Sequence, residues 1–419
     1  MNEDFDLITN DSIQIQNNLV INLNDLTDIE TIINELIKLL NRIQDEIGYN
    51  FTETEKVINE NISLIQPSPK NIFNWLIKNQ TSSQYIFFLG FLYSNGIFVE
   101  KDYNKAFNLF LKASEDNYSI SQVYLGKSYE DGIGIKKDLK KAFNWYKKAA
   151  KNENKFAQFY LGECYRRNRG GIYVQKNLEK AFYWYEKAAE SGNKFGQFHL
   201  GKYYYFGITF EKDVGKSFEL YEKSAKQGYI NAQFVLGILY ENEKKDFGKA
   251  FEWYEKAAKD GYKFAQSNLG YFYEKGRGTK KNIEKAIEWY KKSAEQNYGN
   301  AQCNLGFLYE EGKEIDIDLE KAFYWYKRAA ENGYNPAHYN LGKFYQDGIG
   351  IEKNESKAFE HYKKSVDKGY LKGTYILGYF YENGIGTDIN KEEAFKLYEM
   401  AAKEGDQDAQ KRLELISNL

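Results

Sequence analysis

The stretch Lys141-Ala142-Phe143-Asn144-Trp145-Tyr146-Lys147-Lys148-Ala149-Ala150 decides the fold of this chain. Ala142, Tyr146, Ala149 and Ala150 form a stripe at helical spacing, which predicts an amphipathic helix, here called helix B. The stretch recurs along the 419 residues, so the chain is a repeat array. Its leading residue is Ala, or Ser in one copy, and it lies at positions 106, 142, 181, 217, 250, 286, 322, 358 and 394.

A second block precedes each copy of helix B and centres on a Leu-Gly pair. Ala157, Leu161 and Tyr165 are four residues apart and share one helical face, which predicts a partner helix, here called helix A. A glycine within a helix costs about 1 kcal/mol relative to alanine. Its recurrence therefore predicts that two helix backbones approach too closely there for a Cβ atom. These glycines lie at positions 90, 126, 162, 201, 237, 270, 306, 342 and 378.

Length variation is confined to one loop of the repeat. From the leading residue of helix B to the next Leu of Leu-Gly there are always 19 residues. From that Leu to the following helix B there are 17, except for 20 in the third repeat and 14 in the fifth. The turn between repeats is therefore expected to have a fixed geometry, whereas the loop inside each repeat is exposed and free to vary.

These residues resemble the Sel-1-like repeat family. The family pattern of Ala, Leu-Gly-x-x-Tyr, Gly-x-Gly and Lys-Ala-x-x-Trp-Tyr-x-Lys-Ala-Ala is matched by residues 121–405, and the resemblance covers about 85–410. It implies an all-α, α/α superhelical solenoid, similar to tetratricopeptide arrays, with helix A lining the concave side. Repeat one departs at Tyr85, repeat five has lost Gly-x-Gly, and repeat eight has His361-Tyr362 in place of Trp-Tyr.

The predicted organisation has four parts. Residues 1–26 are polar and are expected to be disordered. Residues 27–80 are expected to form a helical N-terminal cap, residues 81–408 nine two-helix repeats, and residues 409–419 a C-terminal capping helix.

The N-terminal region carries its own helical pattern. Apolar residues from Ile29 to Ile47 form one face, and Thr27 with Glu30 suggests a capping box at its start. Shorter helices are expected around 54–65 and 70–79. These helices either cover the exposed end of the first repeat or act as a handle for another protein. The region around residues 72–76 also resembles the lead-in to repeats in fungal proteins in which a kinase precedes a Sel-1-like array.

Composition argues against several classes of partner. Lys plus Arg number 58 and Asp plus Glu 60, so an excess of basic charge for nucleic acid is missing. Only two cysteines occur, too few for a disulfide framework. No apolar run approaches the roughly 18–20 residues that span a bilayer. With no signal peptide recognised at the start, the expected location is the cytoplasm.

Catalytic motifs are weak in this chain. Asp246-Phe247-Gly248 spells the metal-binding triplet of kinases but lacks the accompanying motifs and stands where other repeats begin helix B. His199, His338 and His361 lie in different repeats or helices, which argues against a metal site. We therefore expect no catalytic residues, no metal and no cofactor.

The leading interpretation is a non-catalytic scaffold or adaptor that binds a protein or peptide on its helix A surface, in signalling or complex assembly. One alternative is a hydrolase or small-molecule binder, which would need a cluster of titratable residues departing from the repeat. Another, based on resemblance, is a regulatory subunit of a cell-wall synthase or a kinase. A third is an endoplasmic-reticulum degradation adaptor.

Two sets of residues are candidates for partner binding. Arg166, Arg167 and Arg169 form a basic cluster in the enlarged loop of repeat three, suited to an acidic partner. The other set flanks Leu-Gly on helix A, outside the face that packs on helix B, and forms a ladder of amides and aromatics. Its asparagines could instead bond only to neighbouring repeats. The ladder residues are Asn268, Tyr271, Asn304, Phe307, Asn340, Lys343 and Tyr379.

Overall fold

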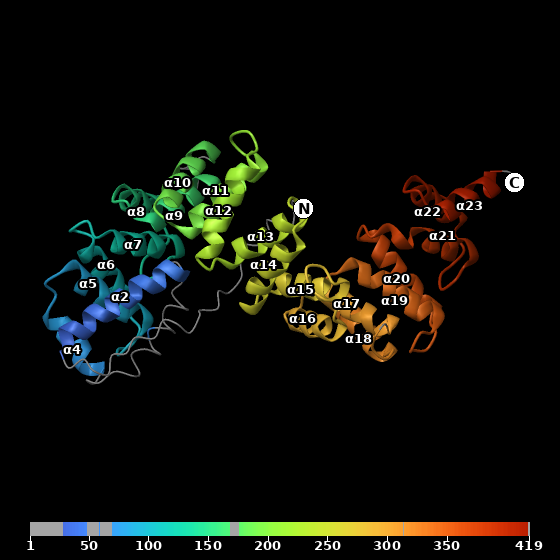
Figure 1. Ribbon diagram of the computed structural model, residues 1–419, viewed down its shortest axis with the longest axis horizontal. Coiled ribbons are helices and arrows are strands. Elements are labelled where there is room, and N and C mark those ends of the chain that lie inside the picture. The colour runs from blue at the N-terminus through green and yellow to red at the C-terminus, as the bar shows by residue number, and fades with distance from the viewer. Residues whose placement is uncertain (1–27, 48–57, 59–68, 168–175, 313, 418–419) are drawn as a thin grey trace. The chain divides into compact units, whose positions relative to one another are not determined.

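The chain is a series of antiparallel helix pairs, seen in a computed structural model that describes residues 28–47, 58, 69–167, 176–312 and 314–417 (Figure 1). Nine pairs follow one another, which confirms the predicted all-α solenoid of two-helix repeats. Segment 1–26 and Arg169 lie outside the described residues, as does the helix expected around 54–65 apart from Ile58.

Helix A of the successive repeats is α5 (Ser83–Asn95), α7 (Ser119–Asp131), α9 (Lys155–Arg167), α11 (Lys194–Phe206), α13 (Ile230–Asn242), α15 (Lys263–Lys275), α17 (Gly299–Glu311), α19 (Asn335–Asp347) and α21 (Thr374–Asn383), the last preceded by the 3-10 turn η2 (Leu371–Gly373). Helix B is α6 (Tyr103–Ala113), α8 (Leu139–Lys151), α10 (Leu178–Glu190), α12 (Val214–Lys226), α14 (Phe247–Lys259), α16 (Ile283–Glu295), α18 (Leu319–Glu331), α20 (Glu355–Asp367) and α22 (Lys391–Lys403).

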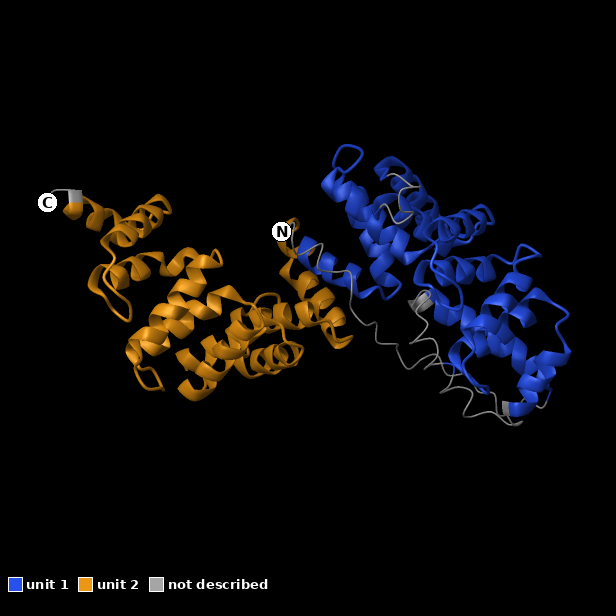
Figure 2. Cartoon of the chain, turned by 180° about the vertical axis from the view of Figure 1, so that it is seen from behind, with its two compact units in different colours: residues 1–239 blue, residues 240–419 orange. Residues whose placement is uncertain are grey.

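The chain divides into two compact units, shown in different colours in Figure 2. Unit 1 comprises residues 1–239 and holds repeats one to four with the first residues of α13. Unit 2 comprises residues 240–419 and holds the rest of the array, followed by α23 (Gln407–Ser417). Helix α23 packs against α22, and Arg412 Nε donates to the Glu382 carboxylate of repeat nine at 3.0 Å.

Helix B begins at an aspartate or asparagine in every repeat. The side chain of this residue accepts a hydrogen bond from the amide three residues later, as Asp138 does from Lys141 at 2.9 Å. Such a cap satisfies an amide that would otherwise lack a partner at the helix start. Asp246 of the kinase-like triplet makes the same bond to the Lys249 amide at 3.0 Å, so it is an ordinary helix cap.

The two helices of a repeat are closed by one backbone hydrogen bond that does not depend on loop length. The amide of the capping residue donates to the carbonyl of the tyrosine in Leu-Gly-x-x-Tyr. The distance is 3.0 Å for Asn177 to Tyr165, across the longest loop, and 2.9 Å for Asp246 to Tyr240, across the shortest. Insertions are tolerated here because both ends of the loop are fixed by the same contact.

The Leu-Gly glycines make room for a ring, which corrects the expected close approach of two backbones. A Cβ atom on Gly306 would lie 2.7 Å from Cδ1 of Tyr326, the fully buried tyrosine of helix B in the same repeat. Gly270 and Tyr290 repeat this arrangement at the same 2.7 Å. Backbones do approach closely at the small residue that opens helix A, since a Cβ on Gly196 would lie 3.0 Å from the Ala189 amide nitrogen.

A glutamine of helix A fixes the turn between repeats. Gln302 donates from Nε2 to the Ala294 carbonyl of the previous helix B at 2.9 Å. Its Oε1 accepts from Asn332 Nδ2, at the end of its own helix B, at 3.0 Å. Because one buried side chain bonds to both neighbours, a residue inserted in this turn would break the contact, consistent with the constant spacing there.

The N-terminal helices occupy two different places. Helix α4 (Pro69–Lys78) packs against α5, with Trp75 edge-on to Tyr85 at 5.2 Å between ring centroids. Helix α2 (Ile29–Ile47) instead reaches beyond the first repeat, since Asp45 forms an ion pair with Lys155 of repeat three at 2.8 Å. Asp28 caps the start of α2 by accepting from the Thr31 amide at 2.9 Å, whereas Thr27 of the expected capping box lies outside the described residues.

Candidate protein-binding surface

The A face is the name used here for one set of positions along helix A. It consists of the helix A positions three and two residues before the Leu-Gly glycine, and one and four residues after it. All seven residues of the predicted ladder occupy the second or third of these positions, from Asn268 to Tyr379. In unit 2 the A face exposes aromatic rings, with Phe307 43% and Tyr379 46% exposed.

Two further ladder residues are held by neighbouring charges. Tyr271 is half-buried, and the Arg277 guanidinium lies over its ring at 5.2 Å from the centroid. Lys343 reaches back to Glu310 of the previous repeat at 3.5 Å. These contacts fix the orientation of the two side chains while leaving them partly exposed. A partner would therefore bind side chains that are already ordered in part.

The three ladder asparagines are half-buried and bond within the array. Asn304 donates to Asn300 Oδ1, one turn earlier in α17, at 3.2 Å. Asn340 donates to the Cys303 sulfur of the previous repeat at 3.5 Å. An amide has two donors and one acceptor oxygen, so these bonds leave capacity for a further partner.

A row of carboxylates on the A face was missed in the sequence. The helix B tyrosine that packs under Leu-Gly donates its hydroxyl to the glutamate four residues after the glycine. The distances are 2.7 Å for Tyr146 to Glu130, 2.9 Å for Tyr290 to Glu274 and 2.6 Å for Tyr326 to Glu310. The sequence signal was the Tyr-Glu pair that ends five of the nine helices A.

Burial and the adjacent carboxylate both act on these tyrosines. Each raises the pKa of the Tyr290 hydroxyl well above its ordinary value, because a phenolate would be desolvated and would face a negative charge. The tyrosines are therefore neutral donors. Their role is to hold helix B against the A face of the same repeat.

Repeat three departs from this pattern and gathers charge. Position four after Gly162 is Arg166, and the Tyr185 hydroxyl donates instead to Glu163 at 2.5 Å. Arg166 and Arg167 both pair with this buried glutamate, at 2.8 and 2.7 Å. The predicted basic cluster is thus partly neutralised by a carboxylate that the sequence reading had not connected with it.

The next helix A adds His199 to this group, with Nδ1 at 3.9 Å from Glu163 Oε1. Burial opposes the charged form of Glu163, but His199 and the two arginines outweigh it and lower its pKa to about 2. Burial lowers the pKa of His199 to about 4, so its imidazole is neutral near pH 7. This is a cluster of titratable residues departing from the repeat, which the sequence reading did not find; the described members already pair with one another.

Repeat eight holds a second histidine contact. His338 Nδ1 lies 3.1 Å from His361 Nδ1, and these residues replace the glutamine of helix A and the tryptophan of helix B. The structure thus brings two of the three histidines together. Among the residues described, no group of three or more His, Cys, Asp or Glu side chains is arranged to hold a metal ion.

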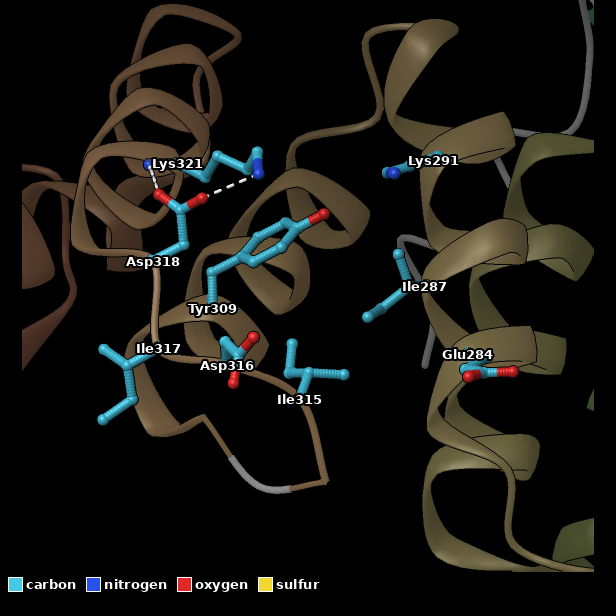
Figure 3. A pocket seen from close by; sticks show the side chains of 9 residues that line it. All are labelled: Glu284, Ile287, Lys291, Tyr309, Ile315, Asp316, Ile317, Asp318 and Lys321. Carbon is cyan, nitrogen blue, oxygen red and sulfur yellow. Dashed lines mark hydrogen bonds and ion pairs between the residues drawn. The ribbon is translucent and has the colours of Figure 1, made fainter.

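A hollow of about 480 Å³ lies in unit 2 between α16 and the loop that precedes α18 (Figure 3). Ile287, Ile315 and Ile317 line it together with acidic and basic side chains. Asp318 in its wall is the cap of α18 and pairs with Lys321 at 2.7 Å. Among its described lining residues there is no His, Cys, Ser or Thr, so they offer no pair of nucleophile and imidazole base.

Comparison with known proteins agrees with this geometry. The Sel1 repeat model matches nine consecutive segments between residues 83 and 406. A protective antigen of uropathogenic Escherichia coli strains, which displays an SLR fold, is 29% identical, with 94% of this chain and 91% of that chain covered and a TM-score of 0.73. A Sel1 repeat protein of Oxalobacter formigenes is 26% identical over 84% of this chain and 95% of its own, with a TM-score of 0.38.

The cysteine-rich protein B of Helicobacter pylori is 30% identical over 32% of this chain and 96% of its own, with a TM-score of 0.27. No curated protein matches the chain. In the part of the chain that the structure describes, no helix has both the length and the apolar character needed to cross a membrane. Nine repeat matches over three quarters of the sequence show that the chain belongs to the Sel1 repeat family.

Proposed function

We propose that this chain is a non-catalytic scaffold that binds a partner protein on the A face of unit 2. The observation that carries the proposal is the exposure of Phe307 and Tyr379, at 43% and 46%, in the same register of repeats seven and nine. Large aromatic rings add contact area at a small cost in conformational entropy and are enriched at protein interfaces. The repeat places them on rigid helices, which limits the ordering cost of binding.

The wider context of this role is also proposed. The family resemblance favours complex assembly or signalling in the cytoplasm, with regulation of a cell-wall synthase or a kinase as a narrower version. The near balance of 58 basic and 60 acidic residues favours a protein partner over nucleic acid. Three arginines of repeat three, Arg166, Arg167 and Arg169, remain a second proposed contact for an acidic partner.

The test compares two matched sets of surface rings. Phe307→Ala with Tyr379→Ala removes the exposed rings of the A face, whereas Tyr183→Ala with Tyr324→Ala removes two rings of helix B that are each 49% exposed. Both double variants are expected to fold, because all four rings are substantially exposed. Quantitative affinity purification with mass spectrometry should show partners lost from the first variant and retained by the second. Equal partner recovery from both would contradict the A face assignment.

A further inference from the structure

Helix α2 lies across helix A of three consecutive repeats in unit 1. Glu30 and Asn34, near its start, accept from the Tyr85 hydroxyl of α5 at 3.0 and 3.2 Å. Gln44, near its end, donates to the Tyr124 hydroxyl of α7 at 3.1 Å, and the following Asp45 pairs with Lys155 of α9. Figure 1 shows α2 crossing the N-terminal repeats in this direction.

One side of α2 is apolar and fully covered. Ile33, Leu36, Leu40 and Ile43 are each 0% exposed, and they follow one another at spacings of three or four residues. The opposite side is polar, with Lys38 and Arg42 exposed. The covered residues share a single apolar cluster with residues of α5 and α7.

The A face beneath α2 is correspondingly apolar. Phe87, Phe88 and Phe91 of repeat one and Val123 and Tyr124 of repeat two occupy A face positions, and none is more than 1% exposed. In repeats six and seven the same positions hold polar residues, a cysteine and a half-buried ring. The equivalents are Ser267, Asn268, Tyr271, Cys303 and Asn304.

Helix α2 stands apart from the repeats themselves. It spans 19 residues where the repeat helices have 10 to 13, and the family match begins only at residue 83. Its backbone amides and carbonyls are bonded within the helix, so its departure would break side-chain contacts and leave the backbone of each repeat intact. An amphipathic helix in a groove is one of the common modes by which proteins recognise one another.

We propose that the A face of repeats one to three is a helix-binding groove, that α2 is its resident ligand in cis, and that an amphipathic helix of a partner protein takes its place. An empty groove would expose the phenylalanines of α5 to water, which favours exchange of one helix for another over simple release. The replacing helix must carry aliphatic residues at the spacing of Ile33, Leu36, Leu40 and Ile43. An amide at the position of Gln44 and an acid at that of Asp45 would meet Tyr124 and Lys155.

The test uses the full chain and a labelled synthetic peptide of residues 28–47 as a model of the external helix. In the variant Ile33→Asp with Leu40→Asp, α2 can no longer seat and the groove is open to the peptide. Attachment in cis gives α2 an effective concentration on the order of millimolar, so a peptide of roughly 10 μM affinity should bind the variant about 100-fold more tightly than the wild type. Fluorescence anisotropy measures both constants.

Two controls distinguish binding of the peptide in the groove from nonspecific hydrophobic binding. The variant Lys38→Asp with Arg42→Asp introduces the same number of aspartates on the exposed side of α2 and should bind the peptide as weakly as the wild type. A peptide carrying Ile33→Asp and Leu40→Asp should bind none of the proteins. Equal binding of the peptide to wild type and open variant, or binding to neither, overturns the proposal.

Hydrogen exchange of the wild-type chain decides the matter if the open variant unfolds unit 1. If α2 can leave the groove while the repeats stay folded, its backbone amides become exposed to solvent more often than those of the repeats. The amide hydrogens of α2 should then exchange at least about tenfold faster than those in the middle of α7. Identical protection of α2 and α7 would make α2 an inseparable part of the core and overturn the proposal. These readouts concern unit 1 alone, so they succeed or fail independently of partner binding by unit 2.

Discussion

The A face of unit 1 and the A face of unit 2 are built on the same repeat, but their aromatic rings differ in exposure to solvent. Phe91 and Phe307 occupy the same position, one residue after the Leu-Gly glycine, yet Phe91 is 0% exposed and Phe307 is 43% exposed. The difference is α2, which shares an apolar cluster with Phe91 in unit 1. Register within the repeat therefore fixes where a side chain points, whereas a segment outside the repeat fixes whether that side chain is covered.

The strongest test of this comparison is the pair Phe91→Ala and Phe307→Ala. Truncating a fully buried phenylalanine leaves a cavity and should lower the free energy of unfolding of unit 1 by about 3–5 kcal/mol. The same change at Phe307 should cost unit 2 no more than about 1 kcal/mol, because the ring is already largely in water. Denaturant unfolding followed by hydrogen exchange assigns each loss to its unit. Similar losses from the two variants would show that α2 does not distinguish the two faces.

The repeat made most of the scaffold predictable. The position of Asp246 before helix B identified it with the equivalent residues of other repeats, and it is indeed a helix cap. The Leu-Gly glycine was correctly recognised as a site of close packing, but its neighbour is the Tyr326 ring, because a periodic pattern shows that space is short without showing what fills it.

The features that escaped prediction join residues far apart in the sequence. The bond between Gln44 and Tyr124 spans 80 residues, and nothing in a local apolar pattern says which face α2 will cover. The cluster around Glu163 and His199 depends on two successive helices A lying side by side. Arg166 and His199 depart from the repeat, and those departures were the available signal for the second cluster.

A second prediction contrasts the buried carboxylate of Glu163 in unit 1 with the more exposed carboxylate of Glu310 in unit 2. Glu163→Gln removes a carboxylate whose side chain is 8% exposed and which pairs with Arg166 and Arg167. We expect it to lower the free energy of unfolding of unit 1 by about 2 kcal/mol, less than a fully enclosed pair, because both arginines can regain water. Glu310→Gln, at a carboxylate that is 20% exposed, should cost unit 2 about 0.5–1 kcal/mol.

The same residue gives unit 1 an acid response of known sign. The pKa of Glu163 in the folded chain is about 2, below its ordinary value of 4.5. Its stabilising contribution is therefore complete above about pH 4.5 and is lost as the pH falls toward 2. Unfolding of the Glu163→Gln variant should lack this part of the pH dependence; an unchanged acid profile would contradict the pairing.

A third prediction concerns the histidine pair of unit 2. Burial, then the neighbouring His338 and the lysines Lys364 and Lys357, lower the pKa of His361 to about 4. Burial and Lys368 also lower the pKa of His338. Both imidazoles are held in the neutral form above the ordinary pKa of 6.5, so their contribution to stability is complete there and is lost as the pH falls below 6.5, down to about 4 for His361.

Replacing the pair by the residues of the other repeats tests this. Between about pH 6.5 and pH 4 the free energy of unfolding of unit 2 should fall in the wild type and in the double variant His338→Gln with His361→Trp. The fall should be about 1–2 kcal/mol smaller in the variant, after allowance for the partial exposure of the histidines. Unit 1 keeps His199, whose pKa is about 4, and its acid response should not change. Hydrogen exchange at several pH values resolves the two units. An unaltered response in unit 2 would remove the histidine pair as its cause.

A small effect on stability, below about 0.5 kcal/mol for each residue, is expected from the ladder asparagines of unit 2. The A face of unit 1 carries Phe88 and Tyr124 at the positions where unit 2 has Asn268, Asn304 and Asn340. The contacts of these amides are hydrogen bonds between neutral groups, such as 3.2 Å from Asn304 to Asn300 and 3.5 Å from Asn340 to the Cys303 sulfur. Changing all three to Ala should therefore lower the free energy of unfolding of unit 2 by less than about 1.5 kcal/mol. If these asparagines contact the backbone of a partner, the variant loses partner binding while its melting temperature stays within a few degrees of the wild type. For a domain of this size a loss of 1 kcal/mol lowers the melting temperature by about 2–4 °C. A large fall in melting temperature would mean that the asparagines hold neighbouring repeats together, and the A face contact would then rest on the aromatic rings alone.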